Sequence, residues 1–274
     1  MDYRIGDERV EVGGVALECR WLGPPPGEAP TVVMLHEGLG CVALWRDFPQ
    51  ALAQRTGCGV FVYSRAGYGL SDPVALPRPL SYMQDEAQDV LPPLLEAIGF
   101  RRGLLLGHSD GASIAATYAG SVQDHRVRGL VLYAPHFFVE EAGLEAIRAA
   151  RVAYETGDLK ARLEKYHGPN VECAFRGWNG AWLDPGFRAF DILDAVAHIR
   201  VPVLIVQGRG DAYGTLAQLD AAEETAYAPV ERVVIEACGH APHLDQPEAA
   251  LEATASFVER LLVTHAEAAP LTAG

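Results

Sequence analysis

Short apolar runs rich in Val, Ile and Leu alternate along the chain with longer segments whose apolar residues recur every three or four positions. The short runs are typical of strands buried on both faces, and the longer segments are typical of amphipathic helices. Strands that alternate with helices predict an α/β fold with a doubly wound, mostly parallel sheet. The predicted strands are 31–35, 59–63, 103–106, 130–133, 203–206 and 232–235, and the predicted helices are 44–55, 82–98, 112–121, 216–227 and 248–263.

Two further segments complete the predicted architecture. Residues 10–21 alternate around Gly13-Gly14, which favours a β-hairpin and brings the sheet to eight strands. About 65 residues separate the sixth strand from the seventh, far more than an ordinary connection, so this segment must be structured. Its helical periodicity at 144–154 and 159–166 and its clustered aromatic residues predict a helical cap inserted after the sixth strand. We therefore expect a core of 1–135 and 201–263, a cap of 136–200 and a flexible tail of 264–274.

Charge and composition narrow the range of partners. The chain has 22 Lys and Arg against 36 Asp and Glu, a net charge of −14, which repels nucleic acid and anionic membranes. No secretory signal or membrane-spanning run is evident, so we expect a cytoplasmic protein with a small-molecule substrate. The five cysteines are scattered without the spacing of a metal site or a disulfide framework. The sequence leaves a homodimer open.

The strongest chemical signal is the pentapeptide Gly107-His108-Ser109-Asp110-Gly111. It matches the pattern G-x-S-x-G and lies between a predicted strand and a predicted helix, where a sharp turn exposes the serine. The pattern also arises by chance in glycine-flanked serine turns, so the strand–turn–helix context carries the argument. Ser109 is therefore a candidate nucleophile.

A serine nucleophile needs a base, and the base needs a carboxylate to orient it. Asp211 follows the predicted strand 203–206 in a glycine-rich loop, and His240 follows the last predicted strand. We expect these two residues to be the acid and the base. His108 and His243 are competing bases, but His108 precedes the nucleophile on the turn and is expected to point elsewhere, while His243 is expected to support the loop.

The order Ser, Asp, His and several loop motifs resemble the α/β-hydrolase fold family, in particular its capped esterase, lactonase and carbon–carbon-bond hydrolase branch. The resemblance covers about 10–263 and includes His36-Glu37-Gly38-Leu39-Gly40, the segment 64–71, and Gly239-His240 followed by Asp245-Gln246-Pro247. It implies an oxyanion hole made by the backbone N–H groups of Gly38 and Asp110. It implies no cofactor and no metal.

Glu37 departs from the family pattern, which has glycine at this position. One interpretation is structural, with the Glu37 carboxylate paired to a nearby arginine such as Arg65. The other is that Glu37 recognises a cation or a hydroxyl group of the substrate. His136, Trp178 and Trp182 are further candidates for substrate contact, although the two tryptophans could equally belong to the core together with Phe187.

The predicted function is hydrolysis of a carboxylic ester of a small organic substrate through an acyl-enzyme. Lactones, thioesters and the carbon–carbon bonds of dienoic or diketone metabolites remain alternatives, because one triad serves them all. A non-catalytic ligand receptor is the alternative of another class. Replacement of Ser109 by alanine separates an enzyme from a receptor.

Overall fold

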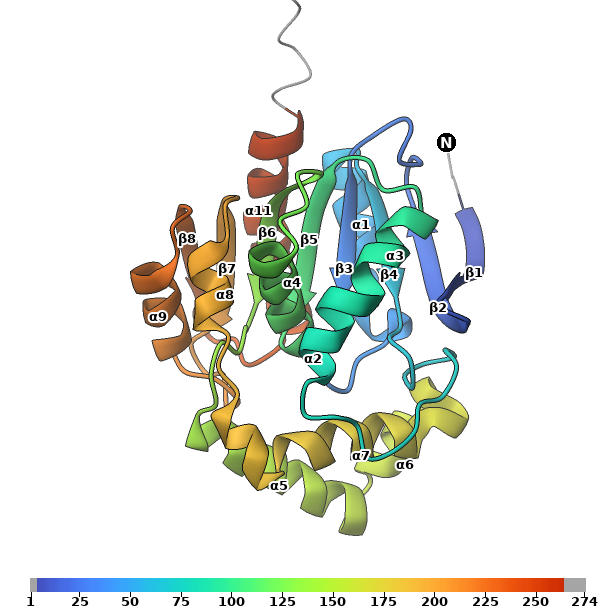
Figure 1. The fold of residues 1–274 in the computed structure, drawn as a ribbon, viewed down its shortest axis with the longest axis vertical. Coiled ribbons are helices and arrows are strands. Elements are labelled where there is room, and N and C mark those ends of the chain that lie inside the picture. The colour runs from blue at the N-terminus through green and yellow to red at the C-terminus, as the bar shows by residue number, and fades with distance from the viewer. Residues whose placement is uncertain (1–3, 264–274) are drawn as a thin grey trace, which may run out of the picture.

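The computed structural model describes residues 4–263, and eight strands within this range form a single sheet in the order β1-β2-β4-β3-β5-β6-β7-β8 (Figure 1). β1 and β2 form an antiparallel hairpin, and β2 also pairs antiparallel with β4. The other neighbouring strands are parallel. The predicted eight-stranded, mostly parallel sheet is confirmed. The strands are β1 Arg4–Val12, β2 Val15–Leu22, β3 Thr31–Leu35, β4 Gly59–Tyr63, β5 Gly103–His108, β6 Val127–Tyr133, β7 Val203–Gly208 and β8 Val230–Ile235.

Helices cover both faces of the sheet, which explains why the central strands are apolar along their whole length. Every residue of β3, β4, β5 and β7 is buried. α1 (Phe48–Thr56) and α11 (Pro247–Val258) pack together on one face, where they share one apolar cluster with the sheet. The opposite face carries α2 (Tyr82–Asp85), α3 (Leu91–Ala97), α4 (Asp110–Ser121) and α9 (Ala217–Thr225), and α10 (Pro242–Asp245) precedes α11.

The long connection between β6 and β7 contains four helices, α5 (Glu141–Thr156), α6 (Leu159–His167), α7 (Val171–Trp182) and α8 (Leu193–His198). α5, α6 and α7 lie across the edge of the sheet where the parallel strands end (Figure 1). α8 instead packs against α4 beside the sheet. The buried aromatic residues of α7 belong to the same apolar cluster as one face of the sheet, so this helical layer and the sheet share one core.

The helices predicted over 44–55 and 82–98 are interrupted in the structure. The helix expected over 44–55 is a short turn at Val42–Trp45 followed by α1, because Arg46 adopts a left-handed φ of 51° and Pro49 lies in the first turn of α1. The helix expected over 82–98 contains a π-helical turn at Glu86–Val90 just before two consecutive prolines. The predicted tail 264–274 lies outside the described residues. In the described range no helix has the length and hydrophobicity that a membrane span requires.

Candidate active site

Ser109 occupies a strained turn between β5 and α4. Its backbone has φ 52° and ψ −117°, a conformation that L-residues rarely adopt. A side chain at Gly107 would collide with the backbone of Gly111, and a side chain at Gly111 would collide with the backbone at the end of β3. The two glycines therefore permit the close approach that forces Ser109 out at the tip of the turn.

The loops after β7 and β8 bring Asp211 and His240 together. Nδ1 of His240 lies 2.8 Å from Oδ2 and 2.9 Å from Oδ1 of the carboxylate. The same carboxylate accepts hydrogen bonds from the N–H of Tyr213 at 2.8 Å and from Nε2 of Gln207 at 2.7 Å. Burial raises the pKa of Asp211, but the contacts with His240 and the Tyr213 N–H outweigh it and leave the pKa below its ordinary value. An ionised Asp211 keeps the proton of His240 on Nδ1 and leaves Nε2 as a proton acceptor.

The loop after β3 orients the peptide group that joins Glu37 to Gly38. The carbonyl oxygen of Glu37 accepts hydrogen bonds from Nη2 of Arg65 at 2.9 Å, Nδ1 of His36 at 2.7 Å and the N–H of Gly40 at 3.1 Å. In a trans peptide the C=O and the following N–H point in opposite directions, so the Gly38 N–H points away from these donors. Among the described residues, neither this N–H nor that of Asp110 donates to another protein group. Both are free to bind an anion.

A cavity of about 120 Å³ joins these parts beneath α5 and α7. Ser109 and His240 both line it, although the structure has no hydrogen bond between their side chains within its described residues. The predicted contacts Glu37, His136, Trp178 and Trp182 also line it, as does Gly38, which lies so close to the Trp178 indole that a methyl group at this position would collide with the ring. The remaining lining residues are Leu39, Ile147 and Tyr213, none of which was predicted from the sequence to contact substrate.

The competing histidines are distinguished by their surroundings. His243 is buried between Trp45 and Phe48, at ring distances of 4.6 and 5.9 Å, and does not line the cavity. Burial, with a smaller contribution from His108, lowers the pKa of His243 to about 3. Burial and the nearby His240 lower the pKa of His136 to about 3 as well. His136 is therefore a neutral hydrogen-bonding group in the cavity wall.

The side chain of Asp110 is more than an accessory to its backbone N–H. It accepts hydrogen bonds from the hydroxyl of Tyr82 at 2.5 Å and from Nε1 of Trp182 at 3.2 Å, and it lies 3.7 Å from the Arg65 guanidinium. All four side chains are buried. The network joins the start of α4 to α2, to the loop after β4 and to α7, so it fixes the first turn of α4 under the helices that close the cavity.

The expected pairing of Glu37 with Arg65 is wrong at the level of the side chains. Arg65 donates to the carbonyl oxygen of Glu37 and lies near Asp110, because the guanidinium is buried beneath the loop. The Glu37 carboxylate turns the other way, and its Oε2 lies 3.3 Å from Nδ1 of His108. Arg65 thus contacts the main chain of Glu37, and the partner of the carboxylate is His108, the residue before Ser109.

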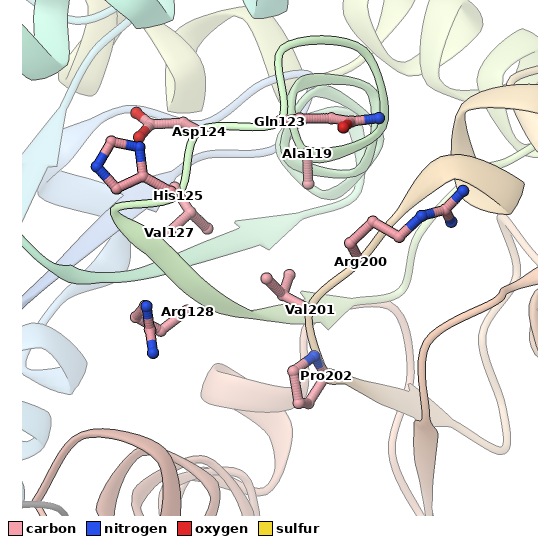
Figure 2. Close-up of a pocket in the computed structure, with 9 residues that line it drawn as sticks. All are labelled: Ala119, Gln123, Asp124, His125, Val127, Arg128, Arg200, Val201 and Pro202. Atoms are coloured by element: carbon pink, nitrogen blue, oxygen red, sulfur yellow. The ribbon is translucent and has the colours of Figure 1, made fainter.

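A larger pocket of about 450 Å³ lies at the opposite end of the sheet, next to the start of β6 and the residues that precede β7 (Figure 2). Its charged and polar lining consists of Gln123, Asp124, His125, Arg128 and Arg200. No predicted site residue contributes to it. The smaller cavity is the candidate active site because it alone of the two contains the strained serine.

An eight-stranded, mostly parallel sheet with a strained serine between β5 and α4 defines the α/β-hydrolase fold. The model of the alpha/beta hydrolase family matches residues 32–254, and the chain belongs to this family. A human (lyso)-N-acylphosphatidylethanolamine lipase is 30% identical over 118 residues, which cover 43% of this chain and 33% of the lipase.

Two solved structures illustrate the shared fold. A meta-cleavage product hydrolase from Pseudomonas fluorescens superposes with a TM-score of 0.74 at 19% identity, covering 92% of this chain and 97% of the other. An enol-lactonase from Burkholderia xenovorans superposes with a TM-score of 0.71 at 19% identity, covering 91% and 99% of the two chains. At these identities the likeness concerns the fold alone.

Proposed function

We propose that the protein is a serine hydrolase that cleaves a small, neutral carboxylic ester through a triad of Ser109, His240 and Asp211. The observation that carries the proposal is the strained Ser109 in one cavity with a histidine whose Nδ1 lies 2.8 Å from an ionised carboxylate. A base, its orienting carboxylate and a nucleophile on separate loops are the parts that acyl transfer requires.

In the proposed mechanism, Nε2 of His240 takes the hydroxyl proton of Ser109 while Oγ attacks the ester carbonyl. The N–H groups of Gly38 and Asp110 bind the oxyanion that forms. The tetrahedral intermediate collapses, and the imidazolium gives its proton to the departing alcohol. Water then attacks the acyl-enzyme with His240 again as base, which releases the acid and regenerates Ser109.

The cavity wall supports a neutral substrate. Leu39, Ile147 and the two tryptophans provide an apolar surface, and no Lys or Arg belongs to the described lining. An anionic substrate such as a dienoic acid would therefore find no Lys or Arg partner in this lining. The small volume favours a short acyl group. A carboxylic ester therefore suits the cavity better than the carbon–carbon alternative, and neutral lactones fit the same description.

The test is hydrolysis of p-nitrophenyl acetate, butyrate and octanoate, of a neutral lactone, and of the monoanionic p-nitrophenyl ester of glutaric acid. We expect acetate and butyrate to be the best substrates and the anionic ester to be the poorest of similar length. Ser109→Ala should lower kcat by at least about 10³-fold. Ser121→Ala, an exposed serine of the same helix, is the matched control. Equal turnover by the wild type and Ser109→Ala, or saturable binding without turnover, would refute the proposal.

A further inference from the structure

Glu37 and His108 form a second carboxylate–imidazole pair beside the proposed triad. The His108 side chain is only 2% exposed. Its Nε2 lies 2.7 Å from the carbonyl oxygen of His240, and its Nδ1 lies 3.3 Å from Oε2 of Glu37. His108 thus reaches the main chain of the proposed base on one side and a carboxylate on the other.

The contacts of His108 show that its Nε2 carries a proton. A carbonyl oxygen only accepts hydrogen bonds, so the 2.7 Å contact requires a proton on Nε2. The other ring nitrogen, Nδ1, is buried and faces Oε2 of Glu37 at 3.3 Å.

The Glu37 carboxylate is ionised. Burial raises the pKa of Glu37, but the contact with His108 and the neighbouring imidazoles outweigh it, so the pKa lies below its ordinary value. The pair therefore brings an ionised carboxylate to 3.3 Å from the His108 ring.

The pair connects three loops that the proposed reaction needs. Glu37 precedes the oxyanion donor Gly38, His108 precedes the nucleophile Ser109, and the carbonyl that His108 holds belongs to His240. The Glu37 carboxylate is also confined, because a methyl group at Gly40 would collide with it. One chain of contacts therefore runs from the loop after β3, through the turn after β5, to the loop after β8.

We propose that the Glu37–His108 pair positions the main chain of His240 and so sets the approach of its ring to Ser109. The inference rests on the proposed function and makes Glu37 and His108 positioning residues. The hydrogen bonds of Asp211 restrain the ring of His240 through Nδ1, whereas the Glu37–His108 pair restrains the backbone that carries the ring. Misplacement of a reacting group by about 1 Å can cost about 10²-fold in rate, so such a restraint has a measurable effect.

Kinetics of four variants test the positioning role on p-nitrophenyl acetate. His108→Ala removes the donor to the His240 carbonyl and should lower kcat about tenfold or more, with KM changed less than twofold. His108→Gln can place an amide N–H near the former Nε2 and should recover a large part of that loss. Glu37→Ala should lower kcat severalfold. Glu37→Gln keeps the shape of the side chain and can donate from its amide to Nδ1 of His108, so it should retain at least half of kcat. Glu236→Ala, exposed beside the base loop, is the control.

The same variants distinguish positioning from substrate recognition. If Glu37 binds a cation or hydroxyl group of the substrate, Glu37→Gln should raise KM for a cationic ester relative to a neutral one. A change confined to KM, or kcat within twofold of wild type in both alanine variants, would overturn the positioning role. Thermal melting of each variant identifies any unfolding, and Glu37→Ala preserves the test if His108→Ala does not fold, because Glu37 lies at the cavity wall.

A spectroscopic readout separates this inference from the proposed function. Nitrogen-15 NMR of the histidine side chains should show Nε2 of His108 protonated and hydrogen-bonded in the wild type, as the 2.7 Å contact with the His240 carbonyl requires. The measurement needs no substrate, so it holds even if the wild type shows no esterase activity. An unprotonated Nε2 in the wild type would overturn the contact that carries the positioning role while leaving the serine mechanism untouched.

Discussion

Replacement of Asp211 by asparagine tests the geometry of the proposed base, His240, most directly, because the two side chains have nearly the same shape. The carboxylate accepts hydrogen bonds from four groups, namely His240, Gln207 and the N–H groups of Tyr213 and Gly214. In Asp211→Asn the amide oxygen can satisfy Tyr213, which leaves the NH₂ group facing His240 and Gln207. His240 must then accept through Nδ1 and carry its proton on Nε2, the nitrogen that should receive the proton of Ser109.

The wrong tautomer and the loss of imidazolium stabilisation should together lower kcat by about 10³–10⁴-fold, or about 4–5.5 kcal/mol of activation free energy. Stability should change much less. The Oε1 atom of Gln207 is buried without a hydrogen bond, so the Gln207 amide can turn and accept from Asn at position 211. This rotation gives up the 3.1 Å hydrogen bond to the Gly214 carbonyl. We expect a loss of about 1–2 kcal/mol in the free energy of unfolding.

The assay is steady-state hydrolysis of p-nitrophenyl acetate with urea denaturation of the same preparations. Asp220→Asn is the matched control, since Asp220 is an exposed carboxylate paired with Arg232 on the outside of the molecule. The expected result is a large loss of kcat with a small loss of stability in Asp211→Asn, and neither in the control. A kcat within tenfold of wild type would refute the argument that Asp211 sets the tautomer of His240.

Three further perturbations follow from the packing of the site. Gly38→Ala should lower esterase kcat about 10²-fold, because the added methyl group collides with Trp178 and displaces the proposed oxyanion donor; activity within threefold of wild type would contradict this. Tyr82→Phe removes a buried donor to Asp110 and should lower the free energy of unfolding by about 1–3 kcal/mol in urea, and an unchanged midpoint would show that the network is not stabilising. The folded-state pKa of His243 is about 3, below its unfolded value near 6.5, so its contribution to stability is complete above pH 6.5 and falls by about 1.4 kcal/mol per pH unit as the pH drops toward 3. Urea unfolding at pH 7 and 5.5 should therefore show a smaller loss in His243→Leu than in the wild type, and equal losses would argue against a neutral, buried His243.

The sheet and the strained turn at Ser109 were predictable because their signals are local. Strands buried on both faces must be apolar throughout, and β3, β4, β5 and β7 show this in the sequence. The turn at Ser109 requires small residues two positions before and after it, which leaves a glycine pattern that can be read directly. The order of the strand ends then indicated which Asp and His would meet.

The contacts that depend on tertiary packing were not predictable. Tyr213 and Ile147 reach the cavity from a loop and from α5, and neither belongs to a motif. The hydrogen bond from Gln207 to Asp211 was not predictable either, because it depends on the position of Asp211 four residues later. The partner of Glu37 was predicted from charge alone, which favours an arginine. The fold placed Arg65 beneath the backbone and left His108 as the nearest partner of the carboxylate.

Burial explains why five histidines can surround one site while only one of them suits the role of base. Burial, together with Arg65, holds the pKa of His36 well below its ordinary value, and the pKa values of His136 and His243 are lowered to about 3. His36 also donates through Nδ1 and accepts from the Arg65 N–H through Nε2, so neither nitrogen can take a proton from substrate. Both nitrogens of His108 face protein atoms. Among the described histidines, His240 alone combines an ionised carboxylate on Nδ1 with a place in the cavity of Ser109. The sequence supplies several imidazoles, and their burial and hydrogen bonds determine which of them can accept a proton in the cavity.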